Sequence, residues 1–299
     1  MRRLSSTDLM LLTPPLMWSL HIVGTRYALT GGFTPLAYLL FRAGIGAMLF
    51  TLLVLWIDRS LRIDGRRNQI LVVLAAVTMA VNQIAFSYAL DVSTAVTVSL
   101  MFGIFPITVA LLAAMIGIER LTARMVVLGA VSFAGVALVV LGVEGGVSSL
   151  SGQLDGILLA LAVPLTWSIF SVLISKPVRT QSPLRINAIT LWGAAIGGFV
   201  AGGWTIGDVD FGAIKGLVWA SVVYSTIGAL IVGNIIWFRA LRRVGPARSS
   251  FYLNLQPFGA AVLAVLLLGE HISWLQILGG VVIGAAILLS RRRAPEPAA

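Results

Sequence analysis

Long apolar runs follow one another along the whole chain, and only short polar segments separate them. A helix that crosses a membrane needs about 20 predominantly apolar residues, at about 1.5 Å of rise each. We read ten runs of this length and therefore predict an all-α membrane protein. The predicted spans are residues 9–29, 34–57, 69–90, 93–117, 122–143, 154–175, 185–205, 213–238, 246–268 and 272–290.

The pattern also repeats at about half the chain length. Residues return in the same order at an offset of 149 or 151: Trp18-Ser19 as Trp167-Ser168, Pro106 as Pro257, and Glu119 as Glu270. This repetition predicts two copies of one five-helix unit, residues 1–148 and 149–293, followed by a disordered tail at 294–299. In an apolar chain, such a duplication is typical of transporters whose substrate lies between the halves.

Composition narrows the classes of function. Mean hydropathy is +1.00 and charged residues make up 11%, which leaves no room for a sizeable aqueous domain. The absence of cysteine excludes disulfides and thiolate metal sites, and the two histidines, His21 and His271, lie too far apart in sequence to form a ligand cluster. We therefore predict no cofactor and no metal.

Basic residues give the chain a net charge of +10 and also indicate its orientation. Apart from Arg42, which lies inside a span, only Arg26 and Lys215 fall in the segments that would lie outside. The other eighteen fall in segments on the side of both termini, so we predict cytoplasmic termini. This distribution is a topology signal and not a nucleic-acid-binding surface. The eighteen are Arg2, Arg3, Arg59, Arg62, Arg66, Arg67, Arg120, Arg124, Lys176, Arg179, Arg185, Arg239, Arg242, Arg243, Arg248, Arg291, Arg292 and Arg293.

The orientation also fixes how the two units are related. Each unit has five spans, an odd number, so the second enters the membrane from the opposite side. Glu119 is then expected in a cytoplasmic loop and Glu270 in an outside loop. We predict two inverted five-helix repeats around a central cavity.

These features together resemble a known family. The chain has a Trp-Ser near the start of each unit, a proline in each fourth span, and Gly-Ile-Glu or Gly-Glu before each fifth span. With Phe41-Arg42-Ala43 in the second span, it resembles the drug/metabolite transporter superfamily of EamA type, and most of all its bacterial amino-acid exporters of the YddG type. The resemblance implies alternating access, export of small metabolites across the bacterial inner membrane, and no enzymatic activity.

Amides in the third span are the first candidates for substrate binding. Met79, Asn82, Gln83 and Phe86 share one helical face, and Gln83 corresponds to Asn234 at the offset of 151. Two amides at related positions suit a polar, uncharged or zwitterionic solute, so we predict that Gln83 and Asn234 face each other across the site. Alternatively, each amide bonds a neighbouring backbone.

Arg42 is the second candidate, because it lies well inside its span and no span carries an acid near its middle. It must be satisfied by helix carbonyls, by water or by an anionic group of a ligand. We hypothesise that it favours a substrate carboxylate. The alternative is a structural arginine that ties helix ends together.

Aromatic residues complete the predicted substrate site: Trp18, His21, Trp167 and Tyr252. They offer stacking surfaces, although aromatic side chains in a membrane protein also serve simply as packing. His21 is the only histidine within a span, and an imidazole can titrate near neutral pH. The alternative for His21 is a hydrogen-bonded structural role.

Two further features concern motion and assembly. Pro106 and Pro257 are expected to interrupt helical hydrogen bonding in spans 4 and 9, either as hinges for alternating access or as static kinks. Spans 5 and 10 are rich in small residues, with Ala130-x-x-x-Ala134 and Gly280-x-x-x-Gly284, a pattern of close helix packing. We predict that these spans are peripheral and provide a homodimer contact.

The leading interpretation is a secondary transporter in the lipid bilayer that exports neutral and aromatic amino acids. Export of other metabolites or drugs is a second interpretation, although no glutamate lies deep in a span to bind cationic drugs. A receptor or structural protein is a third, and the inverted repeat argues against it. An intramembrane enzyme is disfavoured because Ser19 and His21, a possible nucleophile and base, are two residues apart and so point to different faces.

Overall fold

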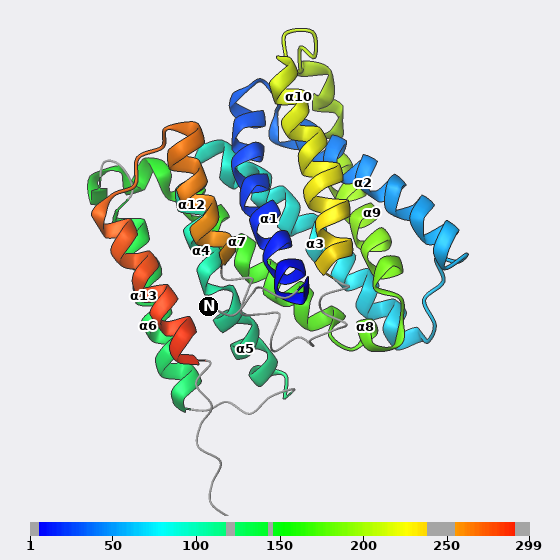
Figure 1. Cartoon of the computed structure of the whole chain (residues 1–299), viewed down its shortest axis with the longest axis horizontal. Coiled ribbons are helices and arrows are strands. Elements are labelled where there is room, and N and C mark those ends of the chain that lie inside the picture. The colour runs from blue at the N-terminus through cyan, green and yellow to red at the C-terminus, as the bar shows by residue number, and fades with distance from the viewer. Residues whose placement is uncertain (1–5, 118–122, 143–145, 238–254, 291–299) are drawn as a thin grey trace, which may run out of the picture.

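The computed structural model describes residues 6–117, 123–142, 146–237 and 255–290, and within these ranges every regular element is helical (Figure 1). The long helices run roughly side by side. The sequence sets the start of α2 (Pro35–Ile57). Thr34 caps this helix by accepting a hydrogen bond from the Ala37 amide, and Pro35 occupies the first helical position. Thr94 caps α4 in the same way, through the Thr97 amide.

The elements of the first half are α1 (Ser6–Thr30), α2 (Pro35–Ile57), α3 (Arg66–Val92), α4 (Ala95–Met101), the 3₁₀ turn η1 (Phe102–Ile104), α5 (Phe105–Met115) and α6 (Ala123–Leu141). Those of the second half are α7 (Gly146–Ile174), α8 (Pro177–Thr180), α9 (Pro183–Gly202), the 3₁₀ turn η2 (Gly203–Asp208), α10 (Gly216–Val223), the π-helix η3 (Tyr224–Gly233), α12 (Leu255–Leu268) and α13 (Trp274–Ser290).

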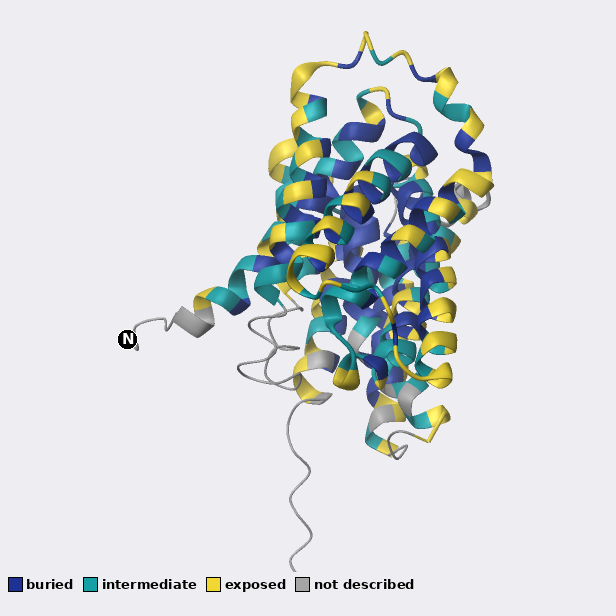
Figure 2. Cartoon of the chain, turned by 90° about the vertical axis from the view of Figure 1, so that its right-hand side faces the viewer, coloured by how far each residue is buried: buried dark blue, intermediate teal, exposed yellow. Residues whose placement is uncertain are grey.

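Five helical segments in the described residues are long and apolar enough to cross a membrane, and four shorter apolar helices accompany them. The five are 35–57, 66–92, 154–174, 183–208 and 216–237. Large apolar side chains remain exposed on the outside of the bundle, whereas the middle is buried (Figure 2). A surface of this kind suits a hydrocarbon surrounding. α1 is long enough but less apolar, because its sequence includes two prolines, His21 and Arg26.

Helices from the two halves alternate in the bundle. α3 packs against α7 and α9, α2 packs against α9, and α1 packs against α12 and the α10–η3 helix. α5 packs against α7. The largest buried cluster combines side chains of α1, α3, α4, α7 and α12, so neither half forms a separate core.

α6 and α13 form a pair at one side of the bundle (Figure 1). Their backbones approach closely at Gly135 and Gly279, because a Cβ added to Gly279 would lie 2.5 Å from the Gly135 carbonyl oxygen. Gly280 and Gly284 instead face Phe258 of α12. Gly135, Gly279, Gly280 and Gly284 thus make contacts within the chain, whereas Ala130 and Ala134 are exposed. The homodimer contact stays a prediction.

The bundle has two ends, which we name by a residue at each. At the Arg185 end, Arg185 pairs with Asp58 at 3.2 Å, and Gln181 accepts a hydrogen bond from the Asp64 amide. At the Glu270 end, Glu270 accepts hydrogen bonds from the first amides of α4, Ala95 at 2.9 Å and Val96 at 2.8 Å.

Two predicted spans are more irregular than their apolar pattern suggested. Span 4 is divided into α4, η1 and α5, so Pro106 lies in the first turn of α5 and not within a continuous helix. A proline there loses no intrahelical hydrogen bond, because the first turn has no acceptor for its amide. Pro257 lies in α12, whose described residues begin at Leu255. Span 8 begins as α10 and continues as a ten-residue π-helix, η3.

Candidate functional site

Four of the predicted site residues are buried polar side chains within the bundle. Relative exposure is 6% for His21, 7% for Arg42, 1% for Asn82 and 9% for Gln83. They come from α1, α2 and α3. Polar groups buried at this depth are expensive unless they are paired or used.

A chain of hydrogen bonds joins three of them. The Arg42 guanidinium donates to the Gln83 amide oxygen at 2.5 Å, and the Gln83 amide nitrogen donates to Asn82 Oδ1 at 2.9 Å. Asn82 Nδ2 in turn donates to the Val163 carbonyl and to Thr166 Oγ1 of α7, both at 2.9 Å. This series of hydrogen bonds, which we call the Arg42 chain, therefore links α2 to α7 through α3 and fixes the direction of each amide.

Arg42 is not neutralised by this chain, since Gln83 offers a neutral acceptor. Among the described residues, the ion pairs are Arg62–Asp64 and Arg185–Asp58, and neither involves Arg42. The buried Nε of Arg42 has no hydrogen-bond partner in the described part of the chain. A guanidinium carries five N–H donors, so Arg42 retains donors and a full positive charge for an acidic group.

A second string of polar side chains runs beside Arg42. Thr25 Oγ1 lies 2.7 Å from the Tyr38 hydroxyl and 3.3 Å from His21 Nδ1. Tyr38 stands one turn before Arg42 on α2, and both are buried. The His21 ring lies against Phe86, with centroids 5.4 Å apart. Sequence reasoning missed Thr25 and Tyr38, although their spacing of four from His21 and Arg42 was a readable signal.

The two Trp-Ser pairs have different surroundings at the indole and similar ones at the serine. Trp18 Nε1 donates to the Ala229 carbonyl of η3 at 3.0 Å, and the Trp18 ring meets Trp237 edge to face at 5.6 Å. Trp167 is 39% exposed, and its ring packs on Phe105 and Phe170.

The serines fasten helices together. Ser19 Oγ lies 2.8 Å from the Pro15 carbonyl and 3.0 Å from the Gln256 carbonyl of α12. Ser168 Oγ lies 2.7 Å from the Pro164 carbonyl and 2.6 Å from Thr108 Oγ1 of α5. Each serine hydroxyl bonds a carbonyl of its own helix and also contacts a neighbouring helix, so both serines take part in helix packing.

The remaining predicted residues are less tied to the cluster. Asn234 follows directly after η3 and is half-buried. Gln83 makes its hydrogen bonds to Arg42 and Asn82, and no hydrogen bond joins it to Asn234 in the structure. Tyr252 lies outside the described residues, as does Glu119. The described residues also hold no group of three or more His, Cys, Asp or Glu side chains that would bind a metal.

These features define a class of protein, an all-helical protein with membrane-length apolar helices and with a buried arginine and two buried amides inside the bundle. A model of the EamA-like transporter family matches residues 5–141 and 154–292, which together make up most of the chain. The chain therefore belongs to the EamA-like transporter family, and it is a multi-pass membrane protein.

Two further likenesses agree with this assignment. A protein of Bacillus subtilis (strain 168) described as an uncharacterized transporter, YyaM, is 23% identical over 264 residues, which cover 86% of this chain and 85% of the relative. One solved crystal structure has a TM-score of 0.64 at 19% identity and covers 95% of this chain and 96% of its own. At that identity the likeness shows the fold alone.

Proposed function

We propose that the protein is a secondary transporter that exports neutral and aromatic amino acids by alternating access. The observation that carries the proposal is Arg42, a buried cation with one neutral hydrogen-bond partner and an unpaired Nε. Arginine in such a state is suited to a carboxylate, which it binds in a bidentate manner. In a family of transporters, the ligand that supplies the carboxylate is the cargo.

The surroundings of Arg42 favour an amino acid over a simple anion. Trp18, His21 and Thr25 follow one another along α1 at spacings of three and four, so they share a face. That face carries an indole, an imidazole and a hydroxyl beside the Arg42 chain. Acceptors on the hydroxyls and on Asn82 suit an ammonium group, and the rings of Trp18 and Trp237 suit an apolar or aromatic side chain.

The ten-span inverted arrangement with cytoplasmic termini belongs to this proposal. It is supported by reciprocal packing, since α1 contacts α12 much as α7 contacts α5. It is also supported by the two tracts that match one family model. In this arrangement the Glu270 end faces away from the cytoplasm.

Transport in a reconstituted system tests the proposal. The purified chain is placed in liposomes, and uptake of labelled leucine and phenylalanine is measured with and without a pH gradient. We expect saturable uptake above that of empty liposomes, and each unlabelled neutral amino acid should compete. Absence of flux for every neutral amino acid tested would overturn the assignment of substrate class and favour a receptor or a carrier of other metabolites.

A further inference from the structure

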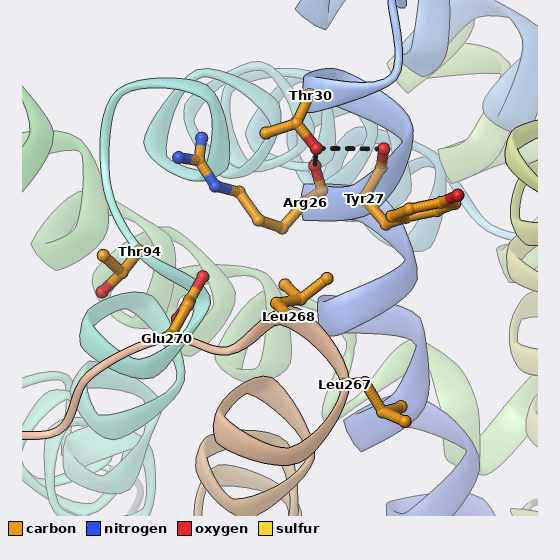
Figure 3. A pocket seen from close by; sticks show the side chains of 7 residues that line it. All are labelled: Arg26, Tyr27, Thr30, Thr94, Leu267, Leu268 and Glu270. Carbon is orange, nitrogen blue, oxygen red and sulfur yellow. Dashed lines mark hydrogen bonds between the residues drawn. The ribbon is translucent and has the colours of Figure 1, made fainter.

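A pocket at the Glu270 end lies apart from the Arg42 chain. It has a volume of about 340 Å³ and lies between the last turns of α1, the turn that joins α3 to α4, and the α12–α13 connection (Figure 3). Its lining combines two charged residues with hydroxyls and leucines: Arg26, Tyr27, Thr30, Thr94, Leu267, Leu268 and Glu270. This volume is within the range of small-molecule sites in proteins.

The two charges of the pocket are held by backbone groups and not by each other. Arg26 uses one guanidinium nitrogen, Nη1, to donate to the carbonyls of Leu90 at 2.7 Å and Asp91 at 2.6 Å. Both Glu270 oxygens accept amides of α4. Neither Arg26 nor Glu270 takes part in the ion pairs of the described residues. The pocket thus presents a fixed cation and a fixed anion at separate points.

Both groups keep hydrogen-bonding capacity for a ligand. Within the described residues, the Nε and the second terminal nitrogen of Arg26 make no hydrogen bond. A carboxylate offers about four acceptor positions, and Glu270 uses one on each oxygen. In Figure 3 the Arg26 side chain reaches from α1 toward the turn that carries Thr94. Glu270 lies beside Thr94, and Leu268 and Leu267 extend toward α1.

This arrangement selects the charge type of a ligand. A simple anion that approaches Arg26 is repelled by Glu270, and a simple cation meets the converse difficulty. A zwitterion places its carboxylate at Arg26 and its ammonium at Glu270. The leucines then accommodate an apolar side chain. We propose that this pocket is a second amino-acid site, at which the cargo binds on its way out of the protein; the proposal rests on the proposed function.

The two ends of the protein differ in sequence at this place. At the offset of 149 that relates the two Trp-Ser motifs, Arg26 corresponds to Ser175 (26 + 149), which Lys176 follows directly. Arg26 is also one of only two basic residues in the segments predicted to lie outside, against the charge bias of the chain. A site on the side predicted to be outside would bind the cargo at the last step of export.

Equilibrium binding tests the site. Labelled L-leucine is titrated onto the purified full chain in detergent, with N-acetyl-leucine and leucinamide as competitors that lack one of the two charges. We expect two leucine molecules bound per chain, and neither competitor should displace the one in the pocket. Arg26→Gln and Glu270→Gln should each weaken one of the two sites by about tenfold or more, whereas Arg42→Gln should leave that site intact.

Two further variants separate the site from a structural role of its charges. Lys215→Gln is the matched control, since Lys215 is the other basic residue in those segments and is exposed. Thr30→Trp fills the pocket but leaves the bonds of Arg26 and Glu270 to the backbone unchanged, so it should block the second site at unchanged melting temperature. Binding of leucine by Arg26→Gln, Glu270→Gln and Thr30→Trp at the level of Lys215→Gln would overturn the site.

The outcomes also distinguish this inference from the proposed function. If wild-type liposomes show no amino-acid flux but Arg26→Gln and Thr30→Trp lose leucine binding, the pocket stands and the transport assignment fails. If flux occurs and those variants bind leucine as Lys215→Gln does, the transport assignment stands and the pocket proposal is wrong.

Discussion

Two helices hold corresponding places in the two family-matched regions: α3, and α10 with η3, which follows it by 151 residues. They differ in backbone conformation and in polar side chains. α3 is a continuous α-helix and carries Asn82 and Gln83. At the corresponding positions, the second helix has Gly233 and Asn234 at the end of a π-helix.

The difference shows how the two family-matched regions, here called the first copy (5–141) and the second copy (154–292), contribute different groups to the bundle. The first copy contributes side-chain amides that hold Arg42. The second contributes a backbone carbonyl, that of Ala229, which receives the Trp18 indole. π-helical turns often mark functional positions, because they change which carbonyls are free. One copy thus supplies polar side chains, and the other supplies a backbone carbonyl that accepts a hydrogen bond from a side chain.

The largest expected effect comes from removing the amide of the first copy. Gln83→Leu leaves the buried Arg42 charge without its hydrogen-bond partner, so we expect a loss of about 3 kcal/mol in the free energy of unfolding. Thermal unfolding in detergent measures the loss. Gln69→Leu is the control, since that amide also donates a hydrogen bond, to the Ile63 carbonyl, but from an exposed position. Equal losses in the two variants would contradict the role of Gln83.

The carbonyl of the second copy is tested by Trp18→Phe, which keeps a ring but loses the hydrogen bond to Ala229. We expect a loss of about 1 kcal/mol and slower transport. Trp192→Phe is matched to it, because the Trp192 indole donates a hydrogen bond of 3.0 Å to Thr51 at an exposed position. Transport by Trp192→Phe should remain at the wild-type rate. A rate as low as that of Trp18→Phe would contradict a specific role of the Trp18–Ala229 hydrogen bond in transport.

A smaller effect on stability is expected from substitution of Gly233, the residue that corresponds to Asn82 in the second copy. A Cβ at Gly233 would lie 3.1 Å from Trp18 Nε1, whereas one at Gly44 would meet nothing within 4 Å. Alanine is preferred over glycine in a helix by about 1 kcal/mol. Gly44→Ala should therefore stabilise the protein, and Gly233→Ala should not. A melting temperature raised equally by both would show that the Trp18 contact tolerates a methyl group.

Pro106 should have the smallest effect on stability. It lies in the first turn of α5, where alanine is tolerated, so we expect Pro106→Ala to change the free energy of unfolding by only about a few tenths of a kcal/mol. If the two positions act as hinges, the double alanine variant slows transport but binds substrate as the wild type does. An unchanged transport rate would leave them as static features.

The sequence predicted much of the helical framework and less of the site. Predicted span 34–57 corresponds closely to α2, because an apolar run of membrane length with Thr34 and Pro35 at its start reads directly as a helix. η1 and η3 were not predicted, since their geometry depends on contacts between helices, such as Trp18 with Ala229. The amide of Gln83 was predicted for the site. Its bond to Arg42 was not, because one sequence does not give the register between two helices.

The central claim is that Arg42, hydrogen-bonded to Gln83, binds the carboxylate of the cargo. The decisive measurement is exchange of labelled phenylalanine by liposomes that contain the Arg42→Leu/Gln83→Leu double variant, which removes the charge together with its partner and so should restore most of the stability lost in Gln83→Leu. We predict a folded protein whose exchange falls to that of empty liposomes. Exchange at the wild-type rate would contradict the claim.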